Sequence, residues 1–190
     1  MSEVQRRQMS TIEADNVFAL RINGTFDDCQ DLVKQAFIQR DFLKPDQYLL
    51  AVKSINWTRI VGQICYYFFA YNRLANHQNL NFSIPTGNFG NVFACYSAFK
   101  MGLPIKTISV AVNDNDILHR FFASNDYSKK QVHETISPSM DISVASNFER
   151  LVYDFFLDRS TAKCAELFNN FPNQGIELDL SLIHISEPTR

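Results

Sequence analysis

The sequence predicts an α/β fold in which a parallel sheet carries helices on its faces. Short apolar runs, rich in β-branched and aromatic residues, alternate with longer segments in which apolar residues recur every three or four positions. Strands separated by segments of helix length pair in parallel through right-handed crossovers. A glycine-bearing turn between one apolar run and the next helix supports this fold, because such sheets bind ligands at the carboxyl ends of their strands.

Two strands and one helix are predicted before residue 53. Residues 16–22 and 48–52 are short apolar runs with the composition of strands. Between them, Asp27 and Asp28 suit the first turn of a helix that extends to Arg40, because carboxylates are favoured near a helix N-terminus. The three segments together predict a strand–helix–strand unit.

A long buried helix is predicted over residues 56–74. Its apolar residues fall three or four positions apart, and further apolar residues make it apolar nearly all round. The same criteria predict the elements that follow. They are a strand at 80–84, a helix at 92–100, a strand at 105–112, a helix from the polar cluster 113–116 through 122, a loop at 124–138, a helix at 146–156 and a helix at 160–171.

Composition limits the possible partners of the chain. With 190 residues and 46% hydrophobic side chains, the chain is long enough for one medium domain with a core, or for part of a larger protein. The formal charge is −2 and no basic block occurs, which argues against nucleic-acid binding. The N-terminus lacks the apolar core of a signal peptide, and residues 60–70 are too few to cross a bilayer. We therefore expect a cytoplasmic protein without a membrane or nucleic-acid partner.

No metal site is predicted. The four cysteines are widely spaced without a Cys-x-x-Cys pair, and the four histidines form no ligand spacing with them. Asp114, Asp116 and His119 lie close together in the sequence, but a helix cap explains the two aspartates better than a metal does.

The turn at residues 83–91, Ser-Ile-Pro-Thr-Gly-Asn-Phe-Gly-Asn, is the strongest local signal for a ligand. Its glycines let the backbone turn sharply and approach a ligand closely, and the free N–H groups at the start of the next helix favour an anion. The turn lacks the Lys-Ser/Thr pair of a triphosphate loop and the spacing of a dinucleotide fingerprint. It fits a single phosphate held by backbone groups and by the amides of Asn88 and Asn91. An ordinary strand-to-helix turn remains the alternative.

Several ordered blocks extend beyond this turn. Together they resemble the threonine synthases, which are pyridoxal-phosphate-dependent enzymes of fold type II, related to tryptophan synthase β. The resemblance covers almost the whole chain up to residue 160. The matching blocks are residues 3–9 (EVQRRQM), 24–30 (GTFDDCQ), 54–59 (SINWTR), 85–91 (PTGNFGN), 101–104 (MGLP), 113–120 (NDNDILHR), 137–142 (SPSMDI) and 146–150 (SNFER).

The resemblance implies a cofactor, a reaction and a set of site residues. Pyridoxal 5′-phosphate would be the cofactor, acting as an electron sink in the conversion of O-phosphohomoserine and water to threonine and phosphate, a step of threonine biosynthesis. The substrate would be a small phosphorylated amino acid. The residues expected to hold the cofactor phosphate are Gly87, Asn88, Phe89, Gly90 and Asn91.

Ser54, Asn56 and Arg59 are candidate substrate-binding residues. They lie between a predicted strand end and the start of the following helix, where they would face the active site, and the Arg59 guanidinium suits a substrate phosphate. Helix capping and a solvent-exposed or structural ion pair are the alternatives for the same residues.

The sequence departs from the family pattern in two ways. Lys53 stands where the family usually has Asn, and the Ser-Phe-Lys-Asp segment that carries the family's Schiff-base lysine does not occur among these residues. No catalytic residue is therefore assigned. Residues 1–179 are interpreted as a partial catalytic region, a fragment that is inactive alone, and residues 180–190 as a non-native tail resembling a translated sequencing adapter.

Two other functions remain open from the sequence. One is a related phospho-lyase acting on a phosphorylated hydroxy amino acid, and the other is a non-catalytic phosphate-binding module. If the chain is a fragment, its strands and its apolar helix would expose surfaces that normally pack against missing segments, so we expect it to aggregate.

Overall fold

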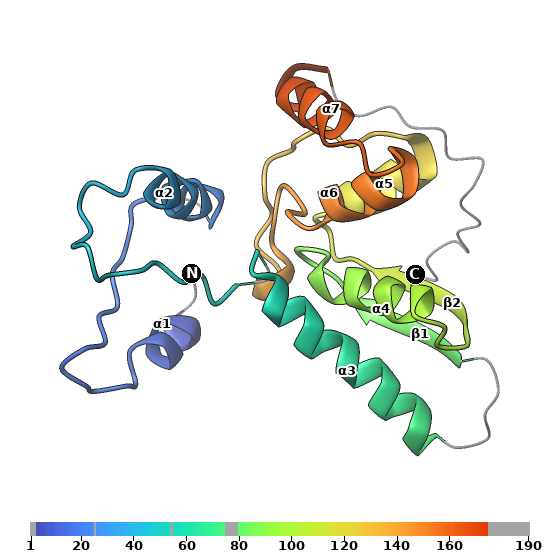
Figure 1. The fold of residues 1–190 in the computed structure, drawn as a ribbon, viewed down its shortest axis with the longest axis horizontal. Coiled ribbons are helices and arrows are strands. Elements are labelled where there is room, and N and C mark those ends of the chain that lie inside the picture. The colour runs from blue at the N-terminus through green and yellow to red at the C-terminus, as the bar shows by residue number, and fades with distance from the viewer. Residues whose placement is uncertain (1–2, 25, 54, 75–79, 175–190) are drawn as a thin grey trace.

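A computed structural model describes residues 3–24, 26–53, 55–74 and 80–174 (Figure 1). Helices dominate, and the two strands lie in the middle of the chain. The elements in order are α1 (Glu3–Met9), α2 (Phe26–Ile38), α3 (Trp57–Arg73), β1 (Leu80–Pro85), α4 (Gly90–Lys100), β2 (Ile105–Ala111), α5 (Ile117–Ser124), the 3-10 turn η1 (Pro138–Met140), α6 (Phe148–Leu151), the π-helical turn η2 (Val152–Phe156) and α7 (Thr161–Gln174).

The strands β1 and β2 form a parallel pair joined by α4, as a βαβ unit requires. Their register places Phe82 opposite Ile108 and Ile84 opposite Val110. Helices α3 and α4 pack together beside this pair, while α1 lies apart from it on the other side of the molecule (Figure 1). The predicted α/β class, with a parallel sheet and flanking helices, is confirmed.

The prediction of two strands before residue 53 is wrong. Residues 16–22 and 48–52 form no strand, and their apolar side chains are largely open to solvent, with Leu20 86% and Leu50 78% exposed. A strand needs a neighbour for its backbone hydrogen bonds, and in the described part of the chain β1 and β2 pair only with each other. These runs have strand composition without a partner strand. Aggregation of the chain through such surfaces stays a prediction.

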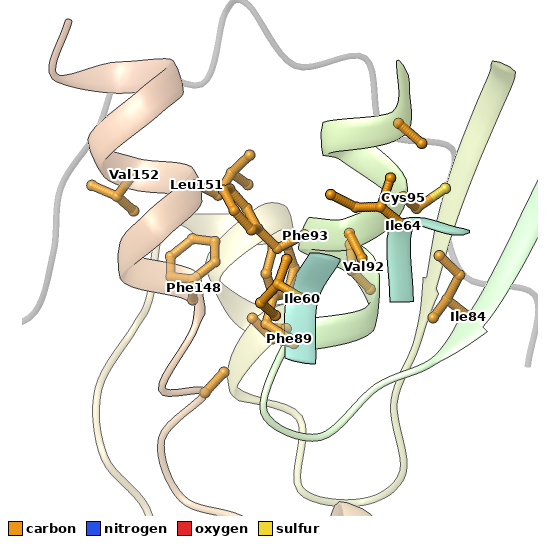
Figure 2. Close-up of a cluster of buried hydrophobic side chains, with 14 of the residues drawn as sticks. Ile60, Ile64, Ile84, Phe89, Val92, Phe93, Cys95, Phe148, Leu151 and Val152 are labelled. Atoms are coloured by element: carbon orange, nitrogen blue, oxygen red, sulfur yellow. The ribbon is translucent and has the colours of Figure 1, made fainter. Parts of the chain in front are cut away.

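The hydrophobic core lies where α3, α4, α6 and the sheet meet (Figure 2). Helix α3 contributes Ile60 and Ile64, which are buried as their spacing of four predicts. The Phe89 ring is also buried and meets Phe148 edge to face, with 5.4 Å between the ring centroids. Because Phe89 belongs to the glycine-bearing turn, the core fixes the turn directly.

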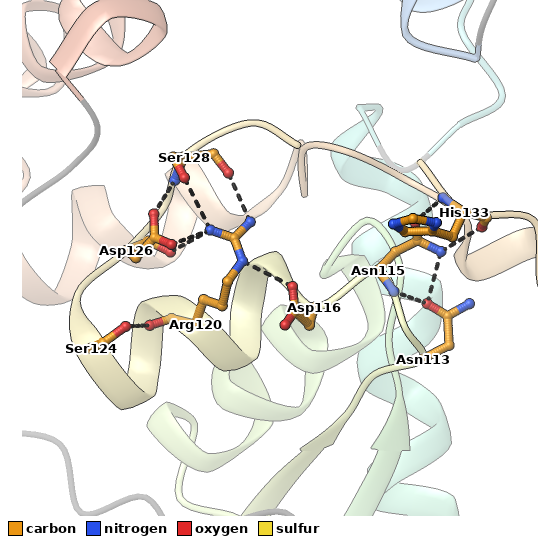
Figure 3. Close-up of polar contacts among 8 residues, drawn as sticks. All are labelled: Asn113, Asn115, Asp116, Arg120, Ser124, Asp126, Ser128 and His133. Atoms are coloured by element: carbon orange, nitrogen blue, oxygen red, sulfur yellow. Dashed lines mark hydrogen bonds and ion pairs between the residues drawn. The ribbon is translucent and has the colours of Figure 1, made fainter. Parts of the chain in front are cut away.

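Helix α5 and the loop after it are tied together by Arg120 (Figure 3). Its guanidinium forms ion pairs with Asp116 and Asp126 and donates to the Ser128 carbonyl at 2.8 Å. Hydrogen bonds from Ser128 and Arg120 lower the pKa of Asp126 well below its usual value. Asp116 precedes α5 as expected, but its side chain binds Arg120 rather than a backbone N–H.

The helix predicted at 146–156 is present in modified form. The α-helical part ends at Leu151, and the chain continues into the π-helical turn, where the Leu157 N–H donates to the Val152 carbonyl at 3.1 Å. That bond spans five residues instead of four, which sequence periodicity does not reveal.

Each helix in the described ranges is too short or too polar to cross a membrane.

Candidate phosphate site

The turn between β1 and α4 has the backbone shape of an anion site. The strand ends at Pro85 and the helix begins at Gly90, with Phe89 between them in the left-handed region at φ 65°. A non-glycine residue in this region is strained, and the strain is tolerated because the Phe89 ring is buried in the core. The turn is thereby held in one conformation.

The backbone donors of this turn have no acceptor in the part of the protein that the structure describes. The first intrahelical bond of α4 runs from the Phe93 N–H to the Phe89 carbonyl at 2.9 Å. Within the described residues, the N–H groups of 87–92 have no protein acceptor, and Phe89 provides no side-chain cap. Unpaired N–H groups at the start of an eleven-residue helix, together with its dipole, favour a bound anion there.

Gly87 lies against the segment Ser139–Met140. A Cβ atom at Gly87 would be 3.0 Å from the Ser139 carbonyl oxygen and 3.2 Å from the Met140 Cα, so no larger residue fits without backbone movement. The opposing segment is held by Asn113, whose amide donates to Asp141 Oδ1 at 2.7 Å. Loss of solvent acts to raise the pKa of Asp141, but hydrogen bonds from Thr135 and Asn113 lower it below its usual value, so the carboxylate stays charged.

The other side of the turn is anchored by the start of α6. The Asn88 carbonyl accepts from the Asn147 backbone N–H at 3.0 Å and from the Asn147 side chain at 3.1 Å. The Asn147 side chain in turn accepts from Arg150 Nε at 3.0 Å, and Arg150 Nη2 donates to the Ile55 carbonyl at 2.9 Å. One buried asparagine thus links the turn to the segment that precedes α3.

The turn opens onto a cavity of about 310 Å³. Residues 85–91 form one wall, and Lys53, Arg59 and Gln63 line another. Among the described residues that line the cavity, two are cations and none is a carboxylate, so the site suits an anion. Gln63 Oε1 is buried and has no hydrogen-bond partner among the described residues, which leaves one polar atom there available to a ligand.

The structure places two of the three candidate substrate-binding residues, Asn56 and Arg59. Ser54 lies outside the described residues. Asn56 caps α3, because its Oδ1 accepts from the Thr58 N–H at 3.0 Å and its amide donates to the Ala51 carbonyl at 2.9 Å. Arg59 lines the cavity while its Nη1 donates to the Val52 carbonyl at 2.9 Å. A contact of any of the three with substrate stays a prediction.

Sequence reasoning missed several lining residues. Gln30 and Gln63 sit on helices whose pattern indicates only an apolar face, so no local signal marks them. Ser139 and Ser146 occur in blocks that match the family, yet their place beside the turn depends on long-range folding.

Within the described residues, no group of three or more His, Cys, Asp or Glu side chains could hold a metal ion.

A family model described as "Pyridoxal-phosphate dependent enzyme" matches residues 1–166, which is most of the chain. The chain belongs to the pyridoxal-phosphate-dependent enzymes. The cofactor of this family is pyridoxal phosphate, as the resemblance implied. The glycine-bearing turn lies within the matched region, so the candidate anion site is part of the segment that matches the family.

Relatives of this pyridoxal-phosphate-dependent enzyme chain confirm the resemblance to threonine synthases. A threonine synthase of Pseudomonas aeruginosa is 53% identical over 92% of the chain and 37% of the relative. One from Saccharomyces cerevisiae is 40% identical over 96% of the chain and 38% of the relative. A pyridoxal-phosphate-bound threonine synthase from Brucella melitensis superposes with a TM-score of 0.76 at 46% identity, over 92% of this chain and 37% of that one. The chain spans less than two-fifths of these proteins.

The residues present fit the phosphate of the cofactor. The unpaired N–H groups, the Gly87 position that a Cβ would fill, and the two cations all accommodate a small anion. The unpartnered Gln63 oxygen provides an acceptor for a polar group on the rest of such a ligand.

Proposed function

We propose that the chain is part of a threonine synthase, the enzyme that converts O-phosphohomoserine and water to threonine and phosphate. The observation that carries the proposal is the turn from Gly87 to Asn91, whose N–H groups have no protein acceptor within the described residues and which lines a cavity without carboxylates among its described lining residues. The similarity to threonine synthases from bacteria and yeast supports the choice of reaction.

In this proposal the turn binds the cofactor phosphate. Gly87, Asn88, Phe89, Gly90 and Asn91 would hold it through backbone N–H groups and asparagine amides. When bound, pyridoxal phosphate would supply an electron sink that stabilises the negative charge left when protons leave the substrate carbons, and this charge permits the substrate phosphate to be eliminated. The residues of the turn hold the phosphate of this group and thereby position the rest of it in the cavity.

Arg59 is proposed to bind the phosphate of the substrate, and Ser54 and Asn56 are proposed as further substrate-binding residues. The guanidinium lines the same cavity as the turn, and the donors not used for the Val52 carbonyl remain for a phosphate oxygen. Lys53 adds a second positive charge to this wall, where the resemblance places an asparagine. The proposed enzyme acts in the cytoplasm.

We further propose that residues 1–179 supply only part of the catalytic region and are inactive alone, and that 180–190, which lie outside the described residues, are not native. Lys53 is the one lysine among the described residues that line the cavity, and it does not lie in a Ser-Phe-Lys-Asp segment.

The chain should therefore bind pyridoxal phosphate without forming a covalent link to it. Borohydride reduction of the mixture, followed by intact-mass measurement, should leave the mass of the chain unchanged, while added inorganic phosphate should displace the cofactor. A mass increase located at Lys53 would show that the chain attaches the cofactor itself and would refute the partial-site proposal. If no pyridoxal phosphate binds, the proposal that the turn from Gly87 to Asn91 holds the cofactor phosphate is refuted.

A further inference from the structure

Tyr67 of α3 contacts the first turn of α4, next to the turn from Gly87 to Asn91. Its hydroxyl is 2.8 Å from Asn91 Oδ1 and 3.0 Å from the Asn91 carbonyl oxygen. The ring is buried and meets Phe82 edge to face, with 5.0 Å between the centroids. Packing of the ring therefore fixes the position of the hydroxyl. The proposed function assigns no role to this hydroxyl.

The Tyr67 hydroxyl is a hydrogen-bond donor at this position. Burial, with a smaller effect from Cys95, raises the pKa of Tyr67, so the phenol stays protonated. Burial also raises the pKa of the Cys95 thiol to about 12, so no thiolate beside Tyr67 competes for the phenol proton. Both nearby Asn91 atoms are oxygens, which can only accept.

An asparagine amide presents an acceptor at one end and a donor at the other. When Oδ1 of Asn91 faces the Tyr67 hydroxyl, the Nδ2 group is the end left for the cavity, which Asn91 lines. No acceptor for this Nδ2 occurs among the described residues. The reverse orientation would direct lone pairs at a phosphate and would repel it.

We propose that Tyr67 is a positioning residue that orients the Asn91 amide so that its NH₂ group donates to the bound phosphate. The inference rests on the proposed phosphate site. Tyr67 is not among the described residues that line the cavity, and its hydroxyl is bonded to Asn91, so in this inference Tyr67 acts on the ligand only through Asn91.

The test is a double-mutant cycle on the affinity of the 190-residue chain for inorganic phosphate and pyridoxal phosphate, measured by calorimetry at concentrations below any self-association. Tyr67→Phe removes only the hydroxyl and keeps the ring against Phe82. We expect Tyr67→Phe and Asn91→Ala each to weaken binding about tenfold, the typical cost of one hydrogen bond to a charged group. The double variant should bind no more weakly than Asn91→Ala alone.

Tyr66→Phe is the matched control on the same helix, because Tyr66 is exposed and lies outside the site, and its affinity should equal that of the unaltered chain. Additive losses in the double variant would show that Tyr67 acts independently of Asn91 and would overturn the inference. Full affinity in Tyr67→Phe would overturn it as well, while leaving the phosphate site intact. If the unaltered chain binds neither probe, the proposed function fails together with the inference.

Discussion

Replacing Gly87 by alanine should weaken the binding of pyridoxal phosphate and of inorganic phosphate by at least about tenfold, because one or two charge-assisted hydrogen bonds are lost. The added Cβ would meet backbone atoms, 3.0 Å from the Ser139 oxygen and 3.2 Å from the Met140 Cα. Backbone atoms of a held segment cannot rotate away as the end of a side chain can, so the turn itself must shift. Equilibrium titration of both ligands measures the loss.

Gly62→Ala is the control for this variant. Gly62 lies inside α3, and a Cβ added there would have no atom of the described residues within 4 Å, so the same chemical change meets no steric obstacle. Ligand affinity should be unchanged, and stability should rise by about 1 kcal/mol, because alanine favours a helix interior over glycine. Equal losses of affinity in both variants would show that the tight contact at Gly87 has no special part in binding.

Phe148→Ala should lower the free energy of unfolding by about 3–5 kcal/mol, the usual cost of removing a buried phenylalanine ring. Phe148 is 0% exposed, and its ring centroid lies 4.7 Å from that of Phe121 and 4.9 Å from that of Tyr127. Because a domain is stabilised by only about 5–15 kcal/mol in total, this single change removes a large share. Urea denaturation followed by circular dichroism measures it.

Phe148→Ala should also disturb the conformation of the turn from Gly87 to Asn91. Phe148 supports the Phe89 ring, which holds the strained residue before α4. Phe148→Leu refills part of the space and should cost less stability, and Phe42→Ala, at a largely exposed position, should cost little. An equal effect of Phe148→Ala and Phe42→Ala on the urea midpoint would contradict the core described here.

Local signals in the sequence were sufficient for the elements around the site. The spacing of apolar residues such as Ile60 and Ile64 predicts α3, and the sequence of apolar run, glycine turn and helix predicts β1 and α4. Each of these segments carries its own periodicity or stop signal and finds its partners close by in the chain. For the same reason the Gly87–Asn91 turn could be recognised from its residues alone.

Features that depend on distant partners could not be predicted in this way. Residues 16–22 have strand composition, but composition does not show whether a neighbouring strand is present. The link from Asn147 to the Asn88 carbonyl joins residues 59 positions apart, and the Tyr67 contact with Asn91 spans 24. Such contacts follow from the packing of whole elements. The sequence of an apolar helix does not show that the hydroxyl of one of its buried tyrosines forms a hydrogen bond to another element.

The central claim is that the turn from Gly87 to Asn91 binds phosphate through its backbone. Titration of the ¹⁵N-labelled chain with inorganic phosphate, followed by amide chemical shifts, tests it most directly. Because these N–H groups have no protein acceptor within the described residues, we predict saturable shifts centred on residues 87–92 that are lost in Gly87→Ala. Shifts confined to other parts of the chain, or no saturable shift at all, would contradict the claim.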